Sequence, residues 1–160
     1  MMGKISGQMQ MLFIDTNELV PENHLLKQID RIVAFAFIYE LAGPYYATKG
    51  RKSIDPVTLI KMLLIGYLYG IKSERQLVEN VQLNIAYRWF CGLELVDKVP
   101  EHSLFSQNRR RRFHDNTLFQ HIFNQIIVKC IEQGIVTGEN VVSDGSFIPA
   151  NVSGNSMARA

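Results

Sequence analysis

The segment from Asp55 to Gly70 restricts the possible folds of this chain more than any other. Residues 56–70 read PVTLIKMLLIGYLYG, with Lys61 as their only charged side chain. Asp55 is a good helix cap and proline is tolerated at the first helical position, so the sequence predicts a helix that begins at Pro56. A helix that is apolar on every face is buried, and this one is too short for a bilayer, which needs about 20 residues. We therefore expect a central core helix that the rest of the chain covers.

The chain before this segment is expected to form one longer helix. Apolar residues recur at helical spacing from His24 to about Leu41, and Gly43-Pro44 ends the pattern. The residues up to about Asn23 show no period and are expected to form a tail or loose arm.

Capping residues predict two short helices after the core helix. Ser73, with Gln76 three residues later, fits a capping box. Asn84 is the expected cap of the next helix, which Gly92 closes.

Pairs of apolar residues predict a broad apolar stripe along a later helix. The pairs recur every four residues, at Leu118/Phe119, Ile122/Phe123, Ile126/Ile127 and Cys130/Ile131. Asp115 or Asn116 is the expected cap, and Gly134 ends the pattern.

The pattern changes from helical to strand-like after Gly138. Residues 140–148 read NVVSDGSFI, which favours a strand, an Asp-Gly turn and a second strand. A lone hairpin is not stable unaided, so it needs a sheet that this chain does not contain. The expected fold class is mainly α: a helical bundle with helix-turn-helix-like elements, followed by a truncated β-hairpin.

Positive charge is concentrated in the middle of a chain whose formal net charge is only +2. Residues 49–112 contain 12 basic and 6 acidic side chains, and the excess is sharpest in the four arginines at 109–112. A basic face on a nearly neutral body points to a polyanion partner.

The four arginines end a helix that is predicted over residues 104–113, with Ser103 as its cap. Helix, tight turn, helix is the plan of helix-turn-helix proteins, in which small polar groups and guanidinium groups contact bases and phosphates. The alternative is a solvated charged face beside a core helix. The candidate DNA contacts on this helix are Ser103, Ser106, Gln107, Arg109, Arg110 and Arg112.

Arg88 is a further candidate DNA contact because it stands among aromatic residues, Tyr87, Trp89 and Phe90. The aromatic residues are either a stacking platform for bases or a piece of the core. An arginine beside core aromatic residues often projects to a rim, so Arg88 is expected at the surface.

Several other kinds of site and location are not supported. Cys91 and Cys130 have apolar neighbours, which predicts buried reduced thiols rather than a disulfide framework or zinc site. The four histidines show no ligand spacing. No apolar run is long enough for a membrane span and no secretory cleavage site is evident, so we expect a cytoplasmic protein without a membrane partner.

Asp144 is a candidate metal ligand and catalytic carboxylate because it ends a short apolar strand and precedes Gly145. The alternative is an Asp-Gly hairpin turn. None of the 16 residues after Asp144 is acidic, so this region cannot complete a two-metal site.

The motifs also resemble those of a known family. Residues 50–56 read GRKSIDP, residues 63–95 begin LLIGYLYG and end FCGLEL, and residues 99–113 read VPEHSLFSQNRRRRF. Together they resemble the N-terminal domain of DDE transposases from bacterial insertion sequences, of the InsH type. Residues 141–157, VVSDGSFIPANVSGNSM, resemble the start of the catalytic domain. Leu104 departs from the pattern, since a small hydroxyl residue is usual at its position.

The expected organisation is an N-terminal arm over residues 1–20, followed by two parts that the resemblance implies. These are a helical DNA-binding domain over 21–134 and, over 135–160, the truncated start of a catalytic domain with a ribonuclease-H-like fold. The resemblance implies that the helical domain recognises the terminal inverted repeats of the element, as double-stranded DNA. Asp144 is similar to the first carboxylate of the Asp-Asp-Glu triad, which in the intact family holds two Mg²⁺ ions for DNA strand transfer. No cofactor is expected for this chain by itself.

Two functions follow from these observations. The first is DNA binding by the N-terminal part of a transposase, without catalysis because the other carboxylates are missing. The second is a protein-interaction fragment, in which the apolar stripe over residues 118–131 pairs with full-length transposase or with a second copy. A decayed remnant is a third reading.

Overall fold

The computed structural model describes residues 13–46, 50, 53–112 and 117–135, and these residues are mainly helical. Within these ranges no strand is present. The predicted hairpin with Asp144, and the predicted caps Asp115 and Asn116, lie outside the described residues.

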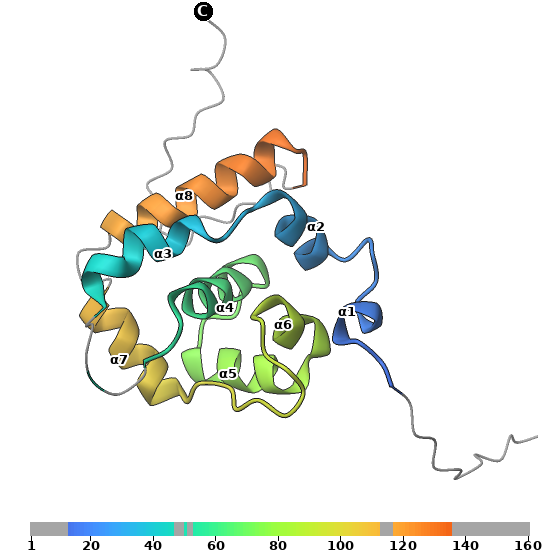
Figure 1. The fold of residues 1–160 in the computed structure, drawn as a ribbon, viewed down its shortest axis with the longest axis horizontal. Coiled ribbons are helices and arrows are strands. Elements are labelled where there is room, and N and C mark those ends of the chain that lie inside the picture. Colours follow the sequence, from blue (N-terminus) through green and yellow to red (C-terminus); the bar gives the residue numbers. More distant parts are fainter. Residues whose placement is uncertain (1–12, 47–49, 51–52, 113–116, 136–160) are drawn as a thin grey trace, which may run out of the picture.

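The apolar segment forms helix α4 (Pro56–Leu68), which the other helices surround (Figure 1). The Asp55 carboxylate accepts a hydrogen bond from the Thr58 backbone N–H at 3.0 Å, so the predicted cap is confirmed. Six of the helix's residues are buried, around more than one face: Pro56, Leu59, Ile60, Met62, Leu64 and Ile65. The prediction of a central core helix is therefore confirmed.

The single helix predicted from His24 to Leu41 is wrong, because the structure divides it into α2 (Leu25–Ile32) and α3 (Phe37–Ala42). The backbone is extended at Val33, and a turn at residues 35–36 follows. The break buries Phe35, whose ring meets Phe90 edge-on with 5.7 Å between centroids. Apolar spacing continues through the break, so the sequence pattern does not reveal it. The 3₁₀ helix η1 (Gly43–Tyr45) ends this part of the chain.

The only charge of α4 is paired at the edge of the core. Lys61 donates to Asp30 of α2 at 2.8 Å, and its ammonium group lies 4.3 Å from the Phe35 ring centroid and 4.8 Å from that of Phe90. One lysine therefore connects α4 to α2, to the turn after α2 and to the helix that carries Phe90.

The two short helices after α4 begin at the predicted caps. Ser73 accepts from the Gln76 N–H at the start of α5 (Glu74–Leu83), and Asn84 accepts from the Tyr87 N–H at the start of α6 (Ile85–Phe90). Asn84 alone joins the two helices, so α5 and α6 meet at a sharp corner.

Helix α7 (His102–Arg112) begins two residues earlier than predicted. The Glu101 carbonyl accepts from the Phe105 N–H at 2.9 Å, which places Ser103 inside the first turn. The expectation that Ser103 caps this helix is therefore wrong.

Part of the stretch expected as a loose arm is helical. Thr16–Leu19 form the short helix α1, which contacts α6 (Figure 1). Lys27 of α2 donates to the carbonyls of Asn17 and Val20, at 2.8 and 2.9 Å, and so holds α1 in place. A lysine that binds carbonyls across the chain leaves no periodic signal in the sequence.

The apolar stripe lies on helix α8 (Thr117–Glu132) and is largely covered by the chain itself. Phe123 packs edge-on against Tyr67 of α4, with 4.7 Å between centroids, and α8 contacts α2. The buried residues of the stripe are Ile122, Phe123, Ile126, Ile127 and Cys130.

We predict that Asp30→Ala lowers the free energy of unfolding by about 1–2 kcal/mol, because Lys61 then loses a charge-assisted hydrogen bond in a largely buried place. Lys61→Met is the matched control: it removes the charge that needs a partner, so the loss should be smaller. Urea unfolding followed by circular dichroism measures both. Equal losses in the two variants would contradict this account of Lys61.

Candidate nucleic-acid interface

Helix α7 is anchored through very few residues. Phe105 is fully buried, and Asn108 is 6% exposed although it is polar. The Asn108 amide donates to the Leu104 carbonyl at 2.7 Å, and its oxygen accepts from the Ser53 hydroxyl at 2.5 Å. The helix is thereby tied to the segment that leads into α4.

Glu74, in the first turn of α5, makes a second anchor. Its carboxylate accepts a hydrogen bond from the Ser106 hydroxyl and another from the Arg109 guanidinium group, the latter at 2.7 Å. Ser106 and Arg109 therefore face α5. Of the predicted DNA contacts, these two are engaged by a neighbouring helix.

The described side chains of α7 that follow His102 and are not engaged in these anchors form an exposed face on the opposite side. Ser103, Gln107 and Arg110 are exposed, as is Arg111. At about 100° per residue, the exposed positions from Ser103 onward fall within an arc of roughly 120° centred on Gln107, and only His102, at the start of the helix, is exposed outside it. Helix α7 contains no acidic residue, so this face carries only positive charge. The side chain of Arg112 is outside the described part of the structure.

The expectation that Arg88 projects to the surface is wrong. Arg88 is 6% exposed, and its guanidinium group donates to the backbone carbonyls of Glu94 and Asp97, the latter at 2.7 Å. It stabilises the turn between α6 and α7. Its neighbour Trp89 is partly buried against the core and lies under Lys27, 5.8 Å from the ring centroid, which favours the core reading of these aromatic residues.

A family model described as a transposase domain (DUF772) matches residues 14–111. The chain belongs to this transposase domain family. The match covers α1 to α6 and nearly all of α7, and it ends before α8. No curated protein and no solved structure matches the chain.

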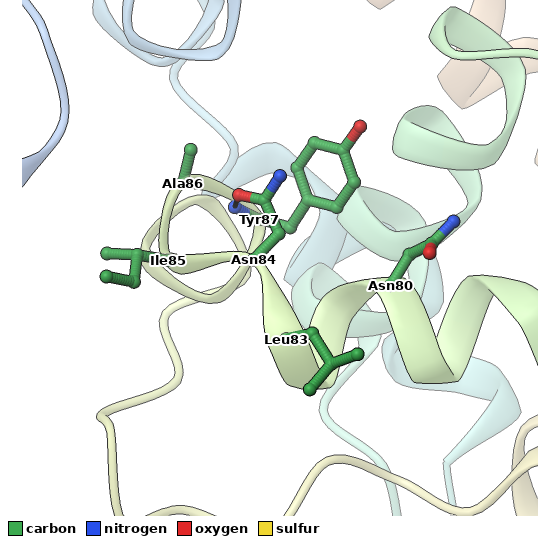
Figure 2. A pocket seen from close by; sticks show the side chains of 6 residues that line it. All are labelled: Asn80, Leu83, Asn84, Ile85, Ala86 and Tyr87. Carbon is green, nitrogen blue, oxygen red and sulfur yellow. Dashed lines mark hydrogen bonds between the residues drawn. The ribbon is translucent and has the colours of Figure 1, made fainter.

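An open hollow of about 500 Å³ lies in the described part of the transposase domain. Figure 2 shows that the side chains around it point in different directions from the corner between α5 and α6. Tyr87 is its only titratable side chain, and burial raises the pKa of that phenol. The hollow is lined by Asn80, Leu83, Asn84, Ile85, Ala86 and Tyr87. These residues supply neither a charged group nor a nucleophile with a base beside it.

Other reactive groups of the transposase domain have structural roles. Within the described ranges, no three His, Cys, Asp or Glu side chains are placed to hold a metal ion. His24 caps α2 by accepting from the Leu26 N–H at 3.2 Å.

None of the described helices combines the length and the apolar character of a membrane span.

Both thiols are buried and reduced, as the sequence predicted. Burial raises the pKa of Cys91 to about 12 and that of Cys130 to about 11. Neither thiol is therefore a nucleophile near neutral pH.

Sequence reasoning missed two residues of this interface. Arg111 is exposed but is not among the predicted contacts, and Glu74 is not among them either. A helical count from Phe105, the one aromatic residue of α7, was the available signal: Asn108 and Arg109 share its side, and Arg111 does not.

We predict that Glu74 and Arg109 are energetically coupled. Glu74→Gln and Arg109→Gln should each lower the free energy of unfolding by about 0.5–1 kcal/mol, and the double variant should lose less than the sum. Urea unfolding of the four proteins measures the coupling. Glu79→Gln, at an exposed position of the same helix, is the control. Strictly additive losses would show that the ion pair does not hold α7.

We also predict that neither thiol reacts readily with an aromatic disulfide reagent at pH 8 while the domain is folded, because the folded state keeps both thiols neutral. Both should react quickly once the protein is unfolded in about 8 M urea, because unfolding exposes the thiols. The Cys130→Ser variant isolates Cys91, which should react more slowly than Cys130 in the folded protein. Rapid labelling of folded Cys91 would contradict its burial.

Proposed function

We propose that this transposase domain binds double-stranded DNA through the exposed face of α7, and that its target is the terminal inverted repeats of the insertion element. The observation that carries the proposal is the separation of the two sides of α7. One side is fixed by Phe105, Asn108 and Glu74, and the other presents polar and cationic side chains without any acid.

The dimensions and chemistry of the face support DNA rather than another polyanion. An α-helix with its side chains is about 10–12 Å wide, which suits the major groove of about 12 Å. Arg110 and Arg111 suit phosphate oxygens, while Ser103 and Gln107, nearer the start of the helix, suit base edges. Helix α5 supports α7 from behind, as the first helix of a helix-turn-helix pair supports the second, although α6 lies between them in the chain.

Association with another protein through the α8 stripe is less well supported. Such pairing needs an exposed apolar face, and Ile122, Phe123 and Ile126 are buried within the chain's own core. The assignment of Asp144 as the first carboxylate of a DDE-type site, holding Mg²⁺, is supported by the resemblance of residues 141–157.

We predict that Arg110→Ala and Arg111→Ala each weaken DNA binding and flatten its salt dependence. Each lost phosphate contact should reduce the slope of log K against log salt by roughly 0.9. Fluorescence anisotropy with a duplex from the element's end, titrated at several salt concentrations, measures both effects.

Arg31→Ala is the matched control, because it removes one exposed arginine from α2 while leaving α7 intact. Its salt slope should equal that of the parent protein. Two findings would overturn the proposal: no binding at low ionic strength, or an Arg110→Ala/Arg111→Ala double variant with an unchanged slope. A scrambled duplex, which should bind more weakly, tests the preference for the element's ends.

A further inference from the structure

One apolar side chain interrupts the polar face of α7. Leu104 is 44% exposed, and the helix has only one other large apolar residue, the buried Phe105. Leu104 lies three residues before Gln107, so the two side chains are neighbours on the same face. A leucine beside a glutamine, near the start of a helix whose later residues are arginines, forms a mixed apolar and amide surface.

The arrangement separates two tasks along the helix. Arg110 and Arg111 follow Gln107 and lie on either side of it around the helix axis, where they suit the two phosphate walls of a groove. Gln107 lies at the centre of the exposed arc, so it is the side chain that reaches farthest toward the floor of a groove that α7 enters. Because Phe105 and Asn108 fix the helix from behind, these positions are held firmly.

We propose that Gln107 and Leu104 determine sequence specificity by reading two neighbouring A·T base pairs in the major groove. This inference rests on the proposed function. The glutamine amide pairs with adenine by donating to N7 and accepting from the N6 amino group. Leu104 packs against the 5-methyl group of a thymine in the neighbouring base pair. No other base of DNA offers that methyl group, and cytosine carries only a hydrogen at the same ring position.

The first test is selection of duplexes from a library with a randomised central region, carried out with the parent protein and with Gln107→Ala and Leu104→Ala. The parent should enrich a motif with an adenine and a thymine at fixed positions. Gln107→Ala should lose the adenine preference, from roughly 5- to 100-fold discrimination to almost none. Leu104→Ala should lose the thymine preference and keep the adenine.

Matched controls come from exposed residues at the C-terminal end of α5, the end opposite Glu74. Gln82→Ala and Leu83→Ala remove the same side chains from exposed positions outside α7. Both should enrich the parent's motif. Circular dichroism melting should show that all four variants are folded, since each changes an exposed residue.

The second test isolates the methyl group. Uracil in place of thymine at the selected position removes only that methyl, and it should weaken binding by the parent about 4-fold, as expected for one buried methyl group. Leu104→Ala should bind the thymine and uracil duplexes equally. A parent protein that does not distinguish the two duplexes would overturn the role of Leu104.

The outcomes separate this inference from the proposed function. If the parent enriches a motif and both α7 variants enrich the same one, the reading by Gln107 and Leu104 is wrong while DNA binding stands. If the parent enriches nothing and shows no salt-dependent binding, the proposed function fails and this inference fails with it.

Discussion

The burial of α4 is the constraint on which the rest of the structure depends. A helix with apolar residues on all sides cannot face water on any of them, so the chain has to surround it with helices from both directions. Its one charge adds a second demand, since an unpaired ammonium group in the core is costly. Lys61 meets Asp30 and two aromatic rings, and those contacts fix the places of α2, the turn after it and α6.

The sequence predicted this part of the fold well where a local interaction decides the structure. Asp55, Ser73 and Asn84 accept hydrogen bonds at helix starts because their short polar side chains reach the nearby N–H groups. The wrong predictions concern places where contacts between residues far apart in the sequence decide the structure. The break after Ile32 is stabilised by the fit of Phe35 against Phe90, which are 55 positions apart, and no local pattern records such a fit.

The same division explains the errors at the interface. Residue type identified α7 as the cationic helix, but it did not say which side of the helix is covered. Arg88 is the clearest case: an arginine among aromatic residues became a buried donor to two carbonyls instead of a surface cation. Arg109 is paired with Glu74, which lies 35 positions earlier in the chain, at the start of α5. Charge alone could not distinguish these roles.

The apolar stripe of α8 is buried within the chain, whereas the cationic face of α7 is exposed. The stripe of α8 is packed inside, so much of the apolar surface of that helix is already buried within the chain. Helix α7 has almost no apolar surface, and its place depends on one phenylalanine, one buried asparagine and an acid on α5. Such an anchor is directional rather than extensive: it fixes which side of α7 faces outward. For a helix that reads a partner by hydrogen bonds and charge, that orientation matters more than a large buried area.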